Sequence, residues 1–429
     1  LVCMLRDGLA FLVVWEMMSV FSFLLVIFES EKKETVKAGI NFLLQMHIGF
    51  VFIMAGFILA FVQTGAAFSF DGLSVYFEEH HSFPLFLLFF VGFGIKAGFI
   101  PFHTWLPLAH PAAPSHISGI MSGVIIKMGI YGILRVLTYI HTDLLGIGIF
   151  ILIVSVISGL LGVMYAIVQH DLKRLLAYHS IENIGIIGIG IGIGLIGIAK
   201  DIPILAVLGF AGGILHVLNH SLFKSLLFYS AGSVYMRTHT RHLEHLGGLI
   251  KKMPKTAFLF LLGALAICGL PPFNGFISEF LIYSGLFKGL QTSSLQTNFI
   301  ILGTAIGLTL IGGLAIFCFT KVFSIVFLGT PRSGSSEKAK EVDGGMILPK
   351  ILAGILIVAI GIYPVFFVKM VGKVVELYVS DISLIIQSTS YMSKISYSSL
   401  VFILLITILW FIRRAQQKRV HIEHGPTWG

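Results

Sequence analysis

The chain has 429 residues, of which 56% are hydrophobic and 11% are charged, and its mean hydropathy is +0.96. Soluble domains carry about 25% charged residues, so this composition excludes a soluble globular domain and predicts an all-α polytopic membrane protein. The net charge of +9 would suggest a nucleic-acid partner in a soluble protein, but basic loops at a membrane surface explain it, so none is expected. The 3 cysteines form no CxxC pair, so neither an iron–sulfur cluster nor a cysteine-rich zinc site is expected, and no cofactor or metal is assigned to this chain.

Apolar runs long enough to cross a bilayer recur along nearly the whole chain. They predict eleven spans, near residues 9–28, 38–64, 84–110, 116–139, 145–168, 174–198, 204–235, 255–288, 298–328, 350–374 and 396–414. The expected organisation is a first half-repeat, a second half-repeat, a cytoplasmic polar loop and C-terminal helices with a basic tail, at 1–139, 140–328, 329–349 and 350–429. The chain begins with Leu1 and no signal peptide precedes the first span, so we expect that leading helices of the first half are missing.

Basic residues concentrate in alternate loops. Eighteen of the 29 Lys and Arg residues lie in one set of segments, and six lie in the opposite set. The basic set comprises 29–37, 110–115, 169–174, 236–255, 329–350 and the tail from residue 413. The positive-inside rule therefore predicts an N-terminus outside and a C-terminus in the cytoplasm.

Ionisable residues inside the spans indicate a route for ions. Each costs about 2.5–3.5 kcal/mol at the centre of a membrane helix, so an isolated set of them would be hard to accommodate. They must be paired, hydrated or neutral, and their number favours function over chance salt bridges. The set comprises Glu16, Lys96, Lys127, Glu182, Lys224 and Glu279.

Three of the polar residues form a ladder in the span near 204–235. His216, His220 and Lys224 recur every four residues, so they share one helix face with about 6 Å of rise between neighbours. Histidine titrates near neutral pH, and a buried lysine responds strongly to its surroundings. The ladder therefore predicts a segment of a proton relay.

Two spans are interrupted, each beside a charge. Gly98 and Pro101 follow Lys96, and the run from Cys268 to Gly275, which contains Pro271 and Pro272, precedes Glu279. Proline removes a backbone donor and breaks a helix. A shift of five spans aligns one break with the other and Glu16 with Glu182, and because five is odd the halves run in opposite directions. Paired broken helices in inverted repeats are typical of transporters.

Several patterns allow another reading. His216 and His220 could bind a haem between helices, which would make the chain a membrane anchor. His103, His110 and His116 border two spans, where they either hydrogen-bond helix ends or line the mouth of a pathway. The GxGxxG match that begins at Gly192 lies inside a span, so helix packing through small residues is favoured over nucleotide binding.

Four segments together resemble the antiporter-like, proton-translocating membrane subunits of complex I, membrane-bound hydrogenases and multisubunit Na+/H+ antiporters. They are GIKAGFIPFHTWLPLAHPAAPSHISGIMSGVIIKMGIYGILR, HDLKRLLAYHSIENIGII, HVLNHSLFKSLLFYSAGSV and GLPPFNGFISEF, and the match covers nearly all of residues 9–328. The HSIEN variant and the TRHLEHLGGL loop resemble the branch of hydrogenase-4 component B and formate hydrogenlyase subunit 3.

The resemblance implies a subunit that moves H+, or as second choice Na+, in response to redox events in neighbouring subunits. It implies no catalytic redox site in this chain, with nickel–iron and iron–sulfur centres in other membrane subunits and in a peripheral hydrogenase or dehydrogenase arm. The competing function is a secondary Na+/H+ antiporter subunit without a redox partner. The implied roles are a modulating glutamate (Glu16), a broken-helix lysine (Lys96), a connecting lysine (Lys127), a central relay (His216, His220 and Lys224) and an exit-side acceptor (Glu279).

Overall fold

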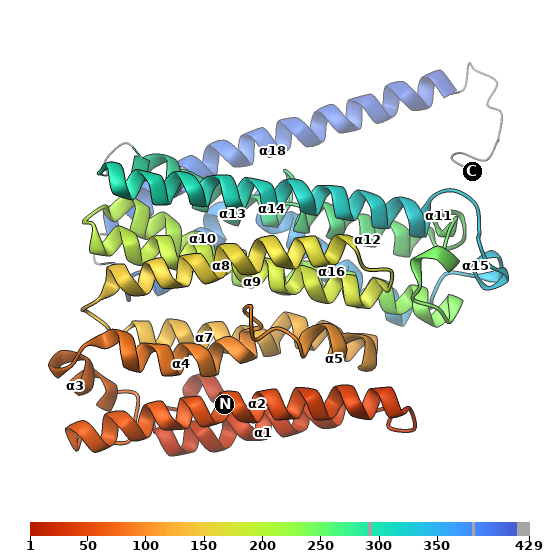
Figure 1. The fold of residues 1–429 in the computed structure, drawn as a ribbon. Helices are drawn as coiled ribbons and strands as arrows, with labels where there is room; N and C mark the ends of the chain where they lie inside the picture. The colour runs from red at the N-terminus through yellow and green to blue at the C-terminus, as the bar shows by residue number, and fades with distance from the viewer. Residues whose placement is uncertain (291–293, 380–381, 418–429) are drawn as a thin grey trace.

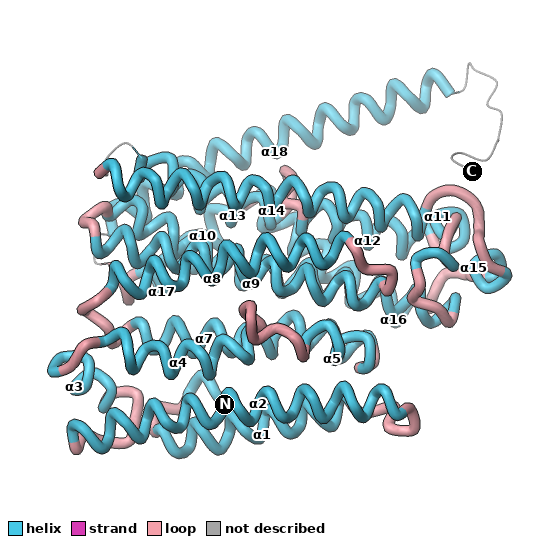
Figure 2. Tube along the Cα trace, in the orientation of Figure 1, coloured by secondary structure: helices cyan, strands magenta, loops and turns pink. Residues whose placement is uncertain are grey.

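The computed structural model describes residues 1–290, 294–379 and 382–417, and within these ranges the chain is helical without a named strand. The long helices run side by side as a bundle (Figure 1), and short loops join them at the two ends (Figure 2). The elements of the first half are α1 (Gly8–Val26), α2 (Lys33–Thr64), α3 (Gly72–Glu79), α4 (Ser82–Ala97), α5 (Leu106–Ala112), α6 (Ser115–Ile120), the π-helical turn η2 (Met121–Ile125) and α7 (Ile126–Leu137). Those of the second half are α8 (Leu144–Ile167), α9 (Leu172–Ala199), α10 (Pro203–Thr238), α11 (Leu249–Lys252), α12 (Pro254–Ile267), α13 (Asn274–Leu290) and α14 (Leu295–Phe327). The remainder are α15 (Gly334–Lys338), α16 (Gly344–Ile362), α17 (Pro364–Val375) and α18 (Ile382–Gln417), and 3-10 turns lie at Val2–Met4 and Leu243–His245.

The predicted membrane spans are present as helices. Among the described residues, 9 helices are long and apolar enough to cross a membrane, and α4 and α12 are shorter apolar helices. These two are the first arms of the two broken spans, which α5 and α13 continue. One span differs from expectation: residues 350–374 form two helices, because Pro364 has no N–H to continue α16 and instead begins α17.

The loops gather at two opposite ends of the bundle, as alternate spans require. At the end with α11 and α15 in Figure 1, Arg241 pairs with Asp171 at 3.1 Å. At the end with α3, the Tyr139 hydroxyl donates to Asp71 at 3.1 Å. The predicted basic set lies at the first of these ends, while its tail beyond residue 417 falls outside the described residues. Which end faces the cytoplasm stays a prediction.

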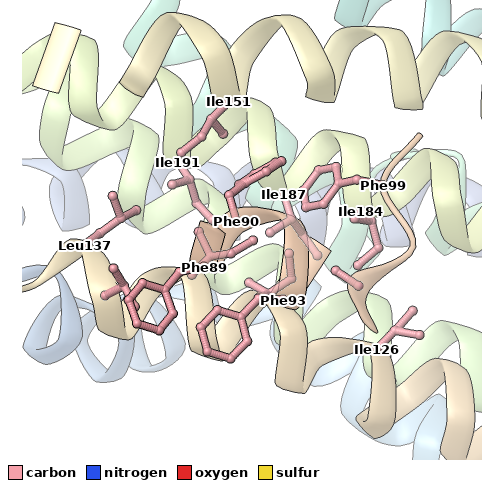
Figure 3. Close-up of a cluster of buried hydrophobic side chains, with 14 of the residues drawn as sticks. Phe89, Phe90, Phe93, Phe99, Ile126, Leu137, Ile151, Ile184, Ile187 and Ile191 are labelled. Atoms are coloured by element: carbon pink, nitrogen blue, oxygen red, sulfur yellow. The ribbon is translucent and has the colours of Figure 1, made fainter. Parts of the chain in front are cut away.

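A buried aromatic cluster joins the two halves. Figure 3 shows Phe89, Phe90 and Phe93 of α4 with isoleucines of α7, α8 and α9. The Phe90 ring meets Phe150 of α8 edge-on at 4.9 Å between centroids. We call this cluster the phenylalanine seam. It packs the first half against the second with ring and methyl carbons only.

Small residues let α9 approach its neighbours closely. Gly192 of the GxGxxG match lies against backbone of α8, and Gly197 lies against Ala206 of α10, so that added β-carbons would meet those atoms. This contact confirms the helix-packing interpretation of that motif. The tight packing around α9 and α10 is what holds the polar ladder rigidly at the centre of the second half.

Candidate ion-conducting site

The first break follows Lys96 directly. Helix α4 ends at Ala97, and Gly98 adopts a left-handed conformation with φ of 85° that most residues avoid. The break leaves the Ile95 carbonyl to be bonded from outside the helix. The indole N–H of Trp105, ten residues later, donates to it at 2.9 Å. The predicted break at Gly98 and Pro101 is therefore confirmed and is stabilised by a specific hydrogen bond.

Lys96 lies in aromatic surroundings. Its side chain is 1% exposed, and its ammonium group donates to the Ser19 hydroxyl at 2.9 Å. The same group lies 5.5 Å from the Trp15 ring centroid and 5.8 Å from that of Phe42. Glu16 of α1 interacts with it electrostatically, and the modulating role expected for Glu16 stays a prediction.

Glu16 has a second neighbour that the sequence did not indicate. Its carboxylate is 3.1 Å from the Nδ1 atom of His47 on α2. One carboxylate oxygen is buried without a hydrogen-bond partner, and the side chain borders an apolar hollow on the outer face of α1. Glu16 thus lies between Lys96 and the edge of the bundle rather than on its central axis.

The second break precedes Glu279. Helix α12 ends at Ile267, and Gly269 takes a left-handed conformation with φ of 61°. A β-carbon at Gly269 would lie 2.8 Å from both carboxylate oxygens of Glu279, so glycine is required for the close approach. Glu279 itself is 8% exposed and lies on α13, after the break at Pro271 and Pro272.

The ladder occupies one face of the unbroken helix α10. The Nε2 atom of His216 is 3.0 Å from the Asn183 amide oxygen of α9, and its Nδ1 is 2.8 Å from the Ser278 hydroxyl of α13. The Asn219 amide donates to the same hydroxyl at 2.8 Å. The rings of His216 and His220 lie 6.4 Å apart at 25°. The predicted face is confirmed, and it joins three helices through hydrogen bonds.

Lys224 continues the ladder towards α9. Its ammonium group donates to the Leu176 carbonyl, and it interacts electrostatically with Glu182. Glu182 in turn pairs with His179, one helical turn earlier on the same face of α9. All of these side chains are no more than 1% exposed, so the charges are held away from lipid and bulk water.

Lys127 lies beside a π-helical turn. Its ammonium group donates to the Ser122 carbonyl of that turn, and the Ser122 hydroxyl is 2.8 Å from the hydroxyl of Ser180 on α9. Such turns open the regular backbone ladder and are common at functional sites. Lys127 interacts electrostatically with His216 and Lys224, so it joins the first half to the ladder.

The structure thus places the predicted residues in two groups. Glu16 and Lys96 form the first. The second group comprises Lys127, Glu182, His216, His220, Lys224 and Glu279, which interact with one another directly or through a shared neighbour. The groups meet where α4 packs on α7, at Ala97 and Gly129.

Sequence reasoning missed several buried polar residues. The spacing of three between His179 and Glu182 was a usable signal that went unread. Lys350, assigned to the basic loop at 329–350, is instead fully buried on α16, where it donates to Ser233 at 2.8 Å and Thr256 at 3.2 Å. Lys173, also assigned to a basic loop, is 2% exposed.

The donor set does not favour a metal or haem. No group of three or more His, Cys, Asp or Glu side chains that could hold a metal ion occurs in the described part of the chain. Both ring nitrogens of His216 already have hydrogen-bond partners, which leaves neither for an axial bond to iron. The residues present suit transfer of protons between side chains.

Comparison with known proteins agrees with this chemistry. Residues 6–309 match the family described as NADH:quinone oxidoreductase/Mrp antiporter, TM. The chain is 43% identical over 357 residues to hydrogenase-4 component B of Escherichia coli K12, covering 82% of this chain and 53% of the relative. It is 44% identical over 255 residues to formate hydrogenlyase subunit 3 of the same organism, covering 59% of this chain and 42% of the relative.

The fold also matches a solved structure. A chain of the Mrp complex from Dietzia sp. DQ12-45-1b superposes with a TM-score of 0.75 at 20% identity, covering 90% of this chain and 76% of that one. At this identity the likeness concerns the fold alone. The chain spans about half the length of the curated relatives named above. The resemblance inferred from the motifs, including its hydrogenase branch, is confirmed.

Proposed function

Because the chain belongs to the family of NADH:quinone oxidoreductase and Mrp antiporter membrane subunits, we propose that it translocates protons for a redox-driven membrane complex. The observation that carries the proposal is the second group of buried polar residues. Lys127, Lys224 and the two ladder histidines interact inside the helix bundle, where Lys127 is 7% exposed and the other three are fully buried. Structural ion pairs alone would not require four bases so close together on the two helices α7 and α10.

The repulsion between buried lysines favours one mobile proton in the second group over several bound ones. Lys127 and Lys224 interact with each other, and two buried ammonium groups repel. One excess proton shared between them is therefore favoured over two. Glu182 interacts with Lys224 and also with Glu279, so the two carboxylates offer acceptors next to the ladder.

The proposed roles follow the two groups. Glu16 modulates the charge of Lys96, and this pair acts as the element that responds to the neighbouring redox subunit. Lys127 passes the proton to His216, His220 and Lys224, and Glu279 releases it. His179 holds the Glu182 carboxylate in place beside Lys224. The two halves correspond to inverted repeats at 1–139 and 140–328.

The partners belong to the proposal as well. The relatives are named as parts of a hydrogenase and a formate hydrogenlyase, so we place this chain beside other membrane subunits and a peripheral hydrogenase arm with nickel–iron and iron–sulfur centres. The basic end of the bundle faces the cytoplasm of a prokaryotic cell. The translocated ion in this proposal is H+, because four of the six residues of the second group are histidine or lysine, which bind protons and carry no oxygen ligand for Na+.

The second candidate is an antiporter subunit without a redox partner. It is favoured by the fold match to a chain of the Mrp complex. The two functions differ in what drives the ion: in a redox complex, electron transfer and ion flux start and stop together.

The test is the full complex purified into proteoliposomes, with hydrogen or formate as electron donor and a lumenal pH dye. Lys96→Ala and Glu279→Gln should each lower proton translocation at least about tenfold, because the first removes the controlling cation and the second removes the exit-side acceptor. Electron transfer without translocation in these variants would support the assignment. Normal proton pumping in both variants would refute the pathway. Ion flux that is the same with and without the electron donor would favour the antiporter.

A further inference from the structure

A charged cavity opens at the basic end of the bundle, outside the ladder. Its volume is about 440 Å³, and its lining includes Glu34, Thr35, Ala112, Asp171, Lys173 and Arg241. We call it the vestibule. Four of the predicted basic-side segments meet here, since 29–37, 110–115, 169–174 and 236–255 all contribute to the lining. Its lining contains both carboxylates and basic groups, so it suits water and protons better than an apolar ligand.

Hydrogen bonds fix the floor of the vestibule. The Lys173 ammonium group donates to the Ala113 carbonyl, and the Arg241 guanidinium donates to the Pro111 carbonyl. Asp171 accepts from the backbone N–H of Lys173 at 2.9 Å and pairs with Arg241. Lys173 is therefore buried yet borders the cavity, on the side that faces the bundle interior.

His110 lies directly behind this floor. It is fully buried on α5, and both of its ring nitrogens lack a hydrogen-bond partner among the protein atoms. Its ring stacks on Phe228 with centroids 4.6 Å apart, and the Lys224 ammonium lies 5.0 Å from the same Phe228 ring centroid. Lys173 and Lys224 both interact electrostatically with His110. One imidazole thus lies between the vestibule and the ladder.

Unpartnered buried imidazoles are rare, because each unsatisfied polar group is costly. His220, on the other side of Lys224, also has both ring nitrogens unpartnered. Water is the usual partner in such places, where it bridges two to four polar groups. Water beside His110 and His220 would connect the vestibule to Lys224 by hydrogen bonds.

We infer that the vestibule is a proton entrance, and that Lys173 and His110 deliver the proton from it to Lys224. This inference rests on the proposed function. The Lys173 ammonium gives a proton through water to one ring nitrogen of His110 and is reprotonated from vestibule water, and the opposite N–H of His110 releases its proton to water beside Lys224. The proton then joins the proposed relay at its Lys224 end, as a second input beside Lys127. It does not pass Lys96, so the Glu16–Lys96 pair controls the route rather than forming part of it.

The first test measures passive proton flux in liposomes that contain the full complex, driven by a potassium diffusion potential. His110→Ala and Lys173→Met should slow proton flux at least about tenfold. The matched controls are His141→Ala and Lys252→Ala, which change an exposed histidine and an exposed lysine away from the vestibule and should keep the parental rate.

Chemical rescue separates proton transfer from a structural role. Imidazole added to the His110→Ala variant should restore flux in proportion to its concentration. Pyrazole, a ring of the same size that is a far weaker base, should not. Equal rescue by both rings would show that the histidine merely fills space and would overturn the role of His110.

The second test measures from which side of the membrane the vestibule can be reached. It leaves His110 and Lys173 unchanged. In a Cys3→Ser background, a cysteine at Ala112 should react with an impermeant cationic thiol reagent applied from the side of α11 and α15. Reaction should block proton flux. The control, His141→Cys, lies at the opposite end and should react from the other side without blocking flux.

The outcomes separate the two claims. A parental complex that carries no protons would overturn the proposed function and the entrance with it. A parental complex that carries protons, with His110→Ala and Lys173→Met at the parental rate, would overturn the entrance alone. Failure of Ala112→Cys to react from the basic side would do the same.

Discussion

The first broken helix carries Lys96 on the arm before its break, and the second carries Glu279 on the arm after it. The breaks themselves are alike. Gly98-Phe-Ile-Pro-Phe-His and Gly269-Leu-Pro-Pro-Phe-Asn align, and both glycines adopt left-handed conformations. Both halves therefore have the same glycine–proline break in the helix, while the ionisable residue beside it differs in type and in position.

The surroundings of the two charges differ as well. Lys96 has one hydroxyl and two aromatic rings near its ammonium group. Close to Glu279, by contrast, Ser278 and Asn219 continue into the ladder through hydrogen bonds. Aromatic rings stabilise a cation but cannot pass a proton, whereas hydroxyl and imidazole groups can. Lys96 has one hydroxyl partner, while the hydroxyl of Ser278 is shared by His216 and Asn219. Under the proposed function we therefore expect the first region mainly to hold charge and the second to conduct it.

The largest expected effect comes from the paired glycines. Gly269→Ala adds a left-handed alanine whose β-carbon meets the Glu279 carboxylate, so we expect a destabilisation of about 3 kcal/mol and loss of proton flux. Gly98→Ala meets a methyl carbon of Leu106 at the same distance of 2.8 Å, a contact that displaces no ionisable group, and we expect about 1 kcal/mol. Thermal unfolding in detergent measures both. Equal losses of stability would mean that the breaks are not differentiated as described.

The second prediction compares the two serines. Ser278→Ala removes the hydroxyl shared by His216 and Asn219, so we expect about 1–2 kcal/mol and slower proton flux. Ser19→Ala removes one hydrogen bond to Lys96 and should cost about 0.6 kcal/mol. Unfolding in mixed detergent gives the stabilities, and dye-monitored flux gives the activities. If Ser19→Ala slowed flux more, the first region would also conduct.

The smallest effect concerns the start of each first arm. The backbone N–H of Ser82 in α4 donates to Asp143 at 2.9 Å, and that of Lys255 in α12 donates to Glu341 at 2.8 Å. A carboxylate at a helix N-terminus accepts hydrogen bonds from backbone N–H groups that have no partner within the helix, and its negative charge interacts favourably with the helix dipole. The same device thus begins both arms at opposite ends of the bundle, and removing either carboxylate should cost about 0.5 kcal/mol.

Glu341 makes this prediction pH-dependent. Partial burial alone would raise the pKa of Glu341, but hydrogen bonds from the side chain and backbone of Thr256 lower it below the ordinary 4.5. The stabilisation is therefore present above pH 4.5 and is lost as the pH falls through the lower, folded-state value. The melting difference between wild type and Glu341→Gln should shrink across this range. A difference that stays constant with pH would contradict the capping role.

The breaks and the ladder could be predicted because their signals are local. Proline and glycine interrupt a helix wherever they fall, and a spacing of four places side chains on one face. Lys96 and His216 were therefore identifiable without knowledge of their neighbours. The division of the tenth predicted span at Tyr363 also had a local signal in Pro364, but an uninterrupted apolar run concealed it.

The remaining site residues depend on partners far away in sequence. Lys350 was assigned to a loop because a count of loop charges carries no information on tertiary contacts. In the structure, Ser233 of α10 and Thr256 of α12 accept hydrogen bonds from it. Lys173 similarly lies over a carbonyl of the segment after α5. Burial of a charge among distant helices is a tertiary property, and no periodicity in one segment reports it.

The phenylalanine seam has an electrical consequence. A proton hops only between donors and acceptors, and the ring and methyl carbons of Phe89, Phe90 and Phe93 offer neither. Under the proposed function, protons that cross between the halves would follow the polar contacts beside the seam, such as that between Ser122 and Ser180. The seam would insulate the rest of the interface between α4 and the second half against proton leaks.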